Sequence, residues 1–321
     1  MKKFIAILAL APVCVFVTGL PAYGADGPPE WAYPVTPLGL VLPPDDGVPR
    51  RVPGSTATYT LTQIRDRFIA PVWHPNEHAP LPDIVAQGRK PDVFACGFCH
   101  RADGPGGPEN ANLAGQPAGY IVQQMADFKS GARTTSVAKR NVDLMIALSK
   151  PITDAEVAAA AAYFSALKPR AVIKVVETDT APKTFIMANH MAAVPSGEKE
   201  PLGSRIVEVP EVLEQFVHRD THAQFIAYVP VGSVAKGEAL VKTGGAGKTL
   251  QCSICHGPDL KGLGNMPAIA GRSPSYMVRQ LYDLKSGARA GANSALMKAV
   301  VANLSVDDMA LIAAYLASQA P

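Results

Sequence analysis

Apolar residues recur at helical spacing along much of the chain, and this pattern predicts a mainly α-helical fold. In the stretch 120–129, Ile121, Met125 and Phe128 fall on one face of a helix, and such a stripe is most simply interpreted as core packing. Further helices are expected from about Asp83 up to Pro91, from about Val234, and over 61–68 after Thr60.

Two N-cap patterns mark where other helices begin. Thr153 followed by Glu156 forms a capping box, and the alanine-rich helix that starts there should end before Pro169. Ser305 caps the last helix of the chain in the same way.

Two regions depart from the helical pattern. Residues 25–90 contain about a dozen prolines, which exclude long helices and central strands, so we interpret them as a proline-rich N-terminal extension. Residues 171–235 are mixed, because Arg205–Val209 alternates like a strand whereas Glu211–His218 resembles a short helix. A connector of this length is expected to pack against the helical parts.

An internal repeat predicts that one helical domain has been duplicated. Residues 115–133 match residues 271–289 at an offset of 156 positions, most clearly in Lys129–Arg133 and Lys285–Arg289. The offset then falls to 152, which implies that one loop differs in length by four residues between the two copies. The predicted domains span residues 91–170 and 236–321.

Both copies of the repeat contain the motif Cys-x-x-Cys-His. This is the attachment signature of a c-type haem, since two thiols at this spacing bond to its two vinyl groups and the following histidine can ligate the iron. A lone Cys-x-x-Cys would be weaker evidence for haem attachment, because redox and zinc sites share that spacing. The sequence therefore predicts two covalently bound haem c groups, held by Cys96, Cys99 and His100 in the first copy and by Cys252, Cys255 and His256 in the second.

The repeat also indicates the second axial ligand of each iron. Met125 and Met277 align with other apolar residues in the opposite copy, which is typical of core positions. Met145 and Met297 match each other, so we predict that they ligate the two irons, with Met125 and Met266 as alternatives. Histidine–methionine ligation fills both axial positions and suits electron transfer.

The N-terminus has the composition of a secretory signal peptide. Lys2 and Lys3 precede the apolar stretch Phe4–Leu20, and Ala22–Gly24 resembles a cleavage site, so we predict a signal peptide at 1–24; the alternative is an uncleaved membrane anchor. Without Cys14 in that segment, the two motifs use all four remaining cysteines and leave none for disulfides or zinc. No later stretch is long and apolar enough to span a bilayer.

The charge balance gives no indication of nucleic-acid binding. The chain has 30 Lys and Arg against 27 Asp and Glu, and removal of the signal peptide lowers the formal net charge from +3 to +1. Residues 236–321 contain nine basic and five acidic side chains, a weak argument for an acidic partner.

Five histidines lie outside the two motifs. They are His74 and His78 in the extension and His190, His218 and His222 in the connector. For His74 and His78 the alternatives are an axial or metal ligand and a surface loop packed on the first domain, of which we favour the surface loop. For the connector histidines we favour a structural or surface role.

These residues resemble the tandem diheme class I cytochromes c of bacterial periplasms, of the c-four type. The resemblance rests on the two haem motifs, on Leu113–Gln116 and Ile269–Arg272, on the matched methionines and on the terminal Ala-Ala-Tyr helix. It implies two all-α class I cytochrome c domains in tandem, located in the periplasm. It also implies electron exchange with a periplasmic dehydrogenase, a membrane oxidase or a bc-type complex. Residues expected to contact the haem pockets are Tyr120, Arg133, Tyr276 and Arg289.

Three functions are consistent with this pattern. We favour a periplasmic electron carrier, because no general acid or base is paired beside the haem motifs. The first alternative is the electron-accepting subunit of a periplasmic dehydrogenase, for which the extension and connector would form a docking surface. The second is a diheme peroxidase-type enzyme, which must keep one iron open for substrate.

Overall fold

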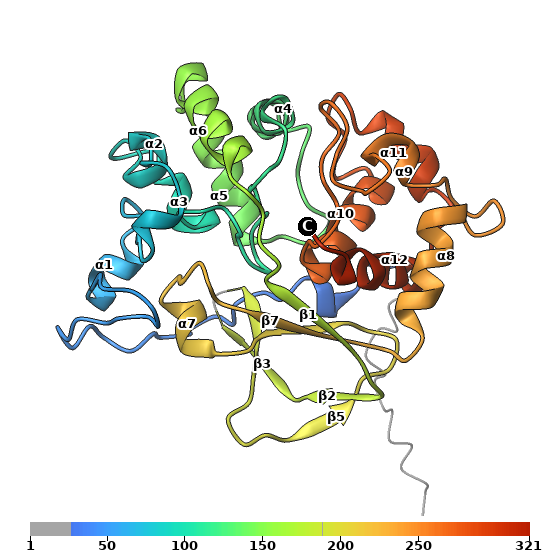
Figure 1. Ribbon diagram of the computed structural model, residues 1–321, viewed down its shortest axis with the longest axis horizontal. Coiled ribbons are helices and arrows are strands. Elements are labelled where there is room, and N and C mark those ends of the chain that lie inside the picture. The colour runs from blue at the N-terminus through green and yellow to red at the C-terminus, as the bar shows by residue number, and fades with distance from the viewer. Residues whose placement is uncertain (1–26, 188) are drawn as a thin grey trace, which may run out of the picture.

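Two groups of helices lie side by side, and a layer of short strands lies beneath both of them (Figure 1). This computed structural model describes residues 27–187 and 189–321. The predicted signal peptide at 1–24 lies outside the described residues.

The first group of helices, here the first lobe, follows the N-terminal extension. Its helices are α2 (Asp83–Ala86), α3 (Cys96–His100), α4 (Ala118–Ser130), α5 (Arg140–Ser149) and α6 (Asp154–Ala166). α4 packs on α5 and α6, and its Ile121 joins Val157 and Phe164 of α6 in the core. The expected stripe on α4 therefore faces the core, with Met125 only partly buried.

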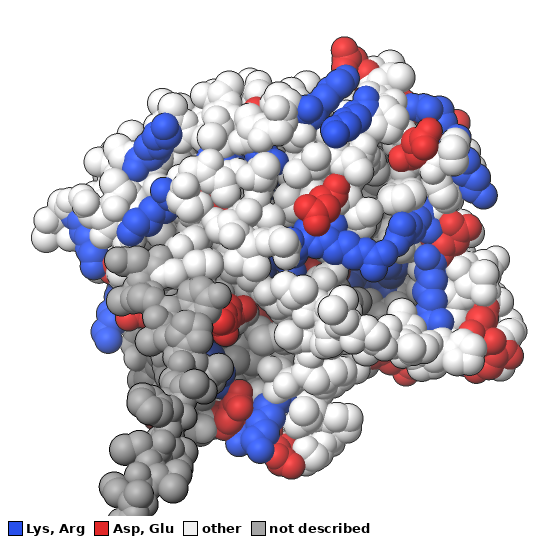
Figure 2. All heavy atoms as spheres, turned by 180° about the vertical axis from the view of Figure 1, so that it is seen from behind, with Lys and Arg blue, Asp and Glu red and all other residues white. Residues whose placement is uncertain are grey.

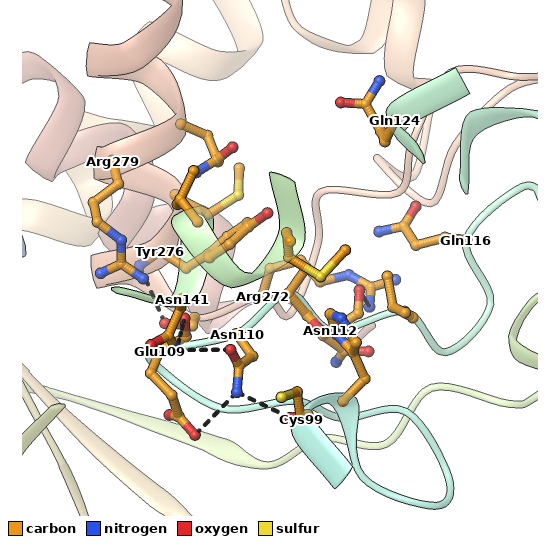
Figure 3. Close-up of a pocket in the computed structure, with 18 of the residues that line it drawn as sticks. Cys99, Glu109, Asn110, Asn112, Gln116, Gln124, Asn141, Arg272, Tyr276 and Arg279 are labelled. Carbon is orange, nitrogen blue, oxygen red and sulfur yellow. Dashed lines mark hydrogen bonds between the residues drawn. The ribbon is translucent and has the colours of Figure 1, made fainter. Parts of the chain in front are cut away.

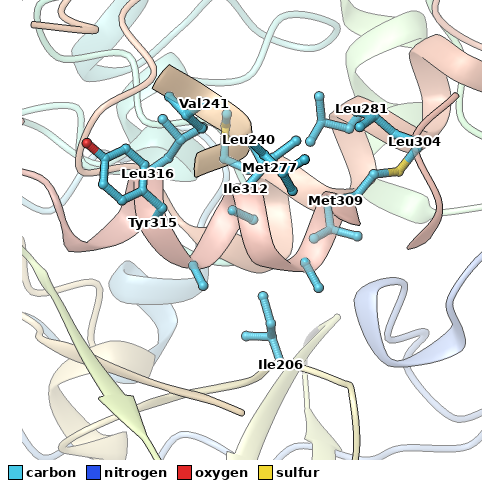
Figure 4. Packing of buried hydrophobic residues seen from close by; sticks show 14 of the residues in the cluster. Ile206, Leu240, Val241, Met277, Leu281, Leu304, Met309, Ile312, Tyr315 and Leu316 are labelled. Atoms are coloured by element: carbon cyan, nitrogen blue, oxygen red, sulfur yellow. The ribbon is translucent and has the colours of Figure 1, made fainter. Parts of the chain in front are cut away.

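The second group of helices, the second lobe, has a larger core of its own. Its helices are α8 (Ser233–Thr243), α9 (Ser253–His256), α10 (Pro274–Ser286), α11 (Ala295–Val301) and α12 (Val306–Ser318). α12 lies between α8, α10 and the strand layer, and it buries Met309, Ile312 and Leu316 in this core (Figure 4). Ile206 of the connector enters the same core from below.

The proline-rich extension forms only short helical turns. They are η1 (Glu30–Ala32), α1 (Leu61–Arg65) and η2 (Pro75–Glu77). Trp73, Val52 and Ile64 make a small core for this region. At its start, Ala32 and Tyr33 are instead buried in the core of the second lobe. Further on, the carbonyl oxygen of Arg67 accepts a hydrogen bond from the backbone N–H of Ala95, so the extension contacts both lobes.

The described part of the connector contains a three-stranded sheet and two antiparallel pairs of strands. In the sheet, β7 (Phe225–Val229) lies between β1 (Ile173–Glu177), which is parallel to it, and β6 (Val207–Pro210), which is antiparallel. The pairs are β2 (Thr180–Pro182) with β5 (Lys199–Pro201) and β3 (Thr184–Met187) with β4 (His190–Ala193). The helix α7 (Leu213–Val217) joins β6 to β7.

The expected helix starts agree with the structure better than the expected helix ends. Thr60, Thr153 and Ser305 each form a complete capping box. The helix from Asp83 ends at Ala86 rather than near Pro91, since Gly88 has a φ of 64°, which an α-helix does not contain. The helix after Thr60 ends at Arg65 rather than Phe68, because Asp66 is extended.

The strand expected at 205–209 is present but is not half exposed as its alternating pattern indicated. It begins at Val207, and all four residues of β6 are buried. Glu208 is buried because its carboxylate accepts hydrogen bonds from Ser273 and Ser275 at the start of α10. The connector therefore packs tightly against the second lobe.

Within the described residues, no single helix is long and apolar enough to cross a membrane. α11 and α12 pass that test only as a pair bent by 109°. On the face seen in Figure 2, basic and acidic side chains are interspersed, and much of the surface is uncharged.

Candidate functional site

The two Cys-x-x-Cys-His motifs lie on the short helices α3 and α9, which hold their histidines in equivalent ways. His100 Nδ1 lies 2.8 Å from the carbonyl oxygen of Ala111, and His256 Nδ1 lies 2.8 Å from that of Pro267. Burial lowers the pKa of both imidazoles, which favours the neutral form that a metal requires. Each Nδ1 bond fixes its ring and leaves Nε2 available for iron.

A cavity of about 1110 Å³, formed by the described residues, is lined by residues of both motifs. Figure 3 shows part of this lining, with Cys99 of the first motif and Arg272 and Tyr276 of the second lobe. Its lining includes the groups predicted to bind haem, namely Cys96, Cys99, His100, Met145, Cys252, Cys255, His256 and Met297. The structure thus brings both sets of residues to one continuous space.

Met145 and Met297 lie on helices that the sequence patterns did not predict. Met145 is on α5 and Met297 is on α11, and both side chains are partly buried. The alternatives Met125 and Met266 also line the cavity, so a position in the lining does not show which methionines ligate the irons. The assignment of Met145 and Met297 as iron ligands stays a prediction.

A reciprocal hydrogen-bond network joins the two lobes at the cavity. Arg133 donates to Gln124 of its own lobe at 2.8 Å and to Tyr276 and Gln280 of the other lobe. Arg289 donates to Gln280 of its own lobe at 3.2 Å and reaches Tyr120 and Gln124 across the boundary. The backbones of Arg133 and Arg289 also pair as an antiparallel bridge. The matched segments of the repeat therefore hold the lobes together as well as lining the cavity.

Two buried arginine atoms in the cavity lining have no hydrogen-bond partner among the described residues. They are Nε of Arg272 and Nε of Arg289. Buried donors are normally paired, so these two fit the carboxylates of a bound haem. Four thiols, two neutral imidazoles and thioethers are also the donors that c-type haems require. The lining thus fits covalently attached haem.

The sequence patterns placed Gln116 and Arg272 in matched motifs but did not indicate that both connect the lobes near the cavity. Gln116 donates through Nε2 to Ala268 O at 3.0 Å, and its repeat partner Arg272 donates to Ala114 O at 3.2 Å. These two residues occupy matching positions at the offset of 156. The sequence did offer one signal of this role, since both residues of the matched pair are polar.

The loop that is four residues longer in the first copy has a clear structural role. It lies between Arg133 and α5, where Ser136 donates from its backbone and hydroxyl to Asp283 of the second lobe. Lys139 is 2% exposed and donates to the carbonyls of Pro34 and Asn189. Burial lowers the pKa of Lys139 to about 7. The longer loop therefore ties together both lobes, the extension and the connector.

The two haem motifs differ in how far they are covered. In the first copy Phe98, between the two cysteines, is 8% exposed and lies under the guanidinium of Arg219, 3.7 Å from its ring centroid. Its repeat partner Ile254 is 66% exposed. Phe94 is partly buried, whereas its repeat partner Leu250 is 53% exposed. The connector and extension thus cover the first motif and leave the second open.

The five histidines outside the motifs differ in their exposure. His74 is buried, and its Nε2 lies 3.1 Å from a carboxylate oxygen of Asp220. His190 and His218 are also buried, whereas His78 and His222 are partly exposed. The surface interpretation is therefore wrong for His74, since the connector covers it.

Comparison with known proteins agrees with this site. The family model of cytochrome c matches residues 234–320. Cytochrome c-554(548) of Halomonas halodenitrificans is 37% identical over 89 residues, which cover 27% of this chain and 98% of that protein.

Two further relatives match most of the chain. The thiosulfate dehydrogenase electron acceptor of Thiomonas intermedia is 29% identical over 234 residues, covering 71% of this chain and 80% of that protein. Cytochrome c4 of Azotobacter vinelandii is 27% identical over 247 residues, covering 74% and 90% respectively. With the haem motifs and their shared cavity, these matches show that the chain belongs to the cytochrome c family of electron-transfer haem proteins and is related within it to cytochrome c4.

Proposed function

We propose that this chain is an exported electron carrier with two covalently bound haem c groups, each ligated by histidine and methionine. The two cytochrome c domains are residues 91–170 and 236–321, and the resemblance to cytochromes c4 favours a periplasmic location. One observation carries the proposal: equivalent sets of two cysteines, one histidine and one methionine line the same cavity.

Each predicted group has a separate task. Haem supplies reversible one-electron chemistry, and the cysteine thiols would hold it covalently. His100 and His256 would bind iron through Nε2, because Nδ1 of each is already bonded to a backbone carbonyl. Arg272 and Arg289 would donate to haem carboxylates and so place positive charge beside bound haem.

The proposal is tested by haem content and by the ferric optical spectrum of the purified protein. We expect two haems per chain and a weak far-red band of the intensity of two sulfur-ligated ferric haems. Met145→Ala and Met297→Ala should each remove about half of that band and lower the potential of one haem, since loss of the methionine removes the ligand that raises it.

Matched controls are Met125→Leu and Met266→Leu, which also change cavity methionines. Both should leave the far-red band unchanged. If either of them removes the band while Met145→Ala or Met297→Ala retains it, the ligand assignment is wrong. A wild-type spectrum with only one sulfur-ligated haem would leave an iron open and would favour the peroxidase-type alternative.

A second candidate is that the chain accepts electrons from a dehydrogenase as its partner subunit. Two observations favour it. The relative from Thiomonas intermedia is named as the electron acceptor of thiosulfate dehydrogenase. The second haem motif is also open, with Leu250, Ile254, Leu263 and Leu296 each more than half exposed, whereas the first motif is covered. Electrons would then enter and leave through the second haem.

Co-purification from the native host distinguishes the two candidates. An electron-accepting subunit should co-elute with a dehydrogenase in a fixed ratio, and substrate added to that complex should reduce its haems. A free carrier should elute alone and exchange electrons with a partner only transiently.

A further inference from the structure

A cluster of ligand-type side chains lies away from the haem cavity, where the extension meets the connector. His74 and Glu77 come from the extension, at and within η2, and His222 comes from the turn before β7. One ligand atom from each of these three residues lies within 4.8 Å of the other two. Neither haem motif contributes to this cluster, and the electron-transfer function does not use it.

The three side chains already contact one another. The rings of His74 and His222 stack with centroids 3.7 Å apart and an angle of 5° between their planes. His222 Nε2 lies 2.8 Å from Oε2 of Glu77. Ligands of a tetrahedral zinc ion lie roughly 3.3 Å apart. The contact between His222 and Glu77 already lies within that spacing, and any wider pair starts from at most 4.8 Å. His222 must turn, and its side chain, 36% exposed, has room to do so.

Asp220 contacts His74 in the way that a carboxylate commonly contacts a histidine that ligates a metal. It is fully buried, and its Oδ1 lies 3.1 Å from His74 Nε2 and accepts from the backbone N–H of His222. Its second oxygen, Oδ2, is buried without a hydrogen-bond partner among the described residues. A carboxylate that holds one nitrogen of a ligating histidine orients the ring and raises its basicity.

The chemistry of the side chains in the cluster also suits a cation, and charged groups surround it. Glu77, Asp220 and Asp103 contribute three carboxylates. Arg170 pairs with Glu77 and Asp103, and Arg101 donates to the backbone carbonyl of Asp220. Two imidazoles and one carboxylate are a donor set that divalent transition-metal ions take in proteins.

We propose that His74, Glu77 and His222 form a binding site for a divalent transition-metal ion, with zinc as the probe, and that Asp220 positions His74. Water from the exposed side completes the coordination, because Glu77 and His222 both reach solvent. The ion joins the extension to the connector over the first lobe. It therefore stabilises the cover of the first haem motif and takes no part in electron transfer.

Zinc titration of the chelator-treated holoprotein by calorimetry tests this site. We expect saturation at one zinc ion per chain and a rise in Tm with zinc concentration. X-ray absorption at the zinc edge should show two imidazole nitrogens and oxygen, and it is not disturbed by the haem iron.

Two surface variants should abolish or weaken the binding without affecting the fold. His222→Ala and Glu77→Gln each remove one ligand from a partly exposed side chain and should raise the zinc Kd by at least tenfold. Asp220→Asn should raise it by about 10- to 100-fold through His74. The matched control is His78→Ala, which removes a nearby histidine outside the cluster and should leave the Kd unchanged.

Unchanged haem spectra in all four variants would show that each still folds as a holoprotein. The proposal is overturned if the wild type shows no saturable zinc binding. It is equally overturned if His222→Ala and Glu77→Gln bind zinc as tightly as the wild type does.

Discussion

Arg101 shows how a single residue couples the first haem motif to the connector. It follows the motif histidine and has a φ of 66°, a region in which its repeat partner Gly257 is unstrained at 83°. The strained backbone costs on the order of 1–3 kcal/mol. Its side chain offsets this cost, because Nε donates to Gly106 O and Nη1 to Asp220 O, each at 2.7 Å, and the guanidinium lies over Phe216.

Arg101→Lys is expected to destabilise the holoprotein by about 2–4 kcal/mol, since it keeps the backbone strain but loses the two directed bonds of the guanidinium. Denaturant unfolding followed by circular dichroism measures the change. Arg101→Gly should be less damaging than Arg101→Lys, because it also removes the strain. If the lysine variant is as stable as the wild type, Arg101 does not hold the connector.

At the scale of elements, α6 shows how a local cap also makes a tertiary contact. Thr153 and Glu156 form the capping box at its start. Glu156 additionally accepts from Arg89 Nε at 2.8 Å, which joins α6 to the segment after α2. The hydrogen bond from Arg89, followed by that from the Thr153 backbone, lowers the pKa of the Glu156 carboxyl to about 2.

This lowered pKa predicts a pH-dependent contribution to stability with a definite sign. A carboxyl whose pKa is lower in the folded state stabilises the protein above its unfolded pKa of about 4.5 and loses that contribution as pH falls to about 2. The Tm difference between wild type and Glu156→Gln should therefore be largest above pH 5 and shrink towards pH 2. The exposure of this ion pair keeps the effect small. A constant Tm difference across that range would contradict the assignment.

At the scale of the whole molecule, the reciprocal arginine network fixes the lobes relative to each other. Arg133 and Arg289 share the oxygens of Gln124 and Gln280 as acceptors. Groups that share partners lose stability non-additively when they are removed. The network thus acts as one unit across the lobe boundary.

Arg133→Gln and Arg289→Gln should each lower the free energy of unfolding by about 1–3 kcal/mol, because buried glutamine oxygens lose charged donors. The double variant should lose less than the sum of the two. Denaturant unfolding of the holoproteins measures this, with Lys129→Gln, an exposed residue of the same segment, as control. Strict additivity would show that the two arginines act separately.

The uneven cover of the two motifs predicts where a redox partner approaches. Ile254→Glu places a charge in the exposed apolar surface beside the second motif and should slow electron exchange with a partner dehydrogenase by about tenfold or more. Phe185→Glu changes an apolar side chain that is 36% exposed on the connector and serves as the control. Stopped-flow reduction of the haems gives both rates. Equal slowing in the two variants would rule out a preferred entry at the second motif.

The sequence by itself determined the features that depend on local spacing. The haem motifs, the capping boxes at Thr153 and Ser305 and the repeat offset could all be read directly, because covalent geometry and hydrogen bonds within a few residues fix them. The prolines of the extension likewise excluded long helices. Helix ends were less predictable, as at Ala86 and Arg65, since they depend on backbone turns and neighbouring segments.

Only the tertiary structure decided which residues meet across long stretches of chain. The burial of Glu208, the bond from Arg133 to Tyr276 and the meeting of His74 with His222 join segments that no periodic pattern relates. The sequence analysis predicts that Tyr120, Arg133, Tyr276 and Arg289 contact the haem pockets. It does not predict that their hydrogen bonds join one lobe to the other. Such contacts depend on how whole elements pack, and that packing is set by the combined burial of apolar surface rather than by local sequence.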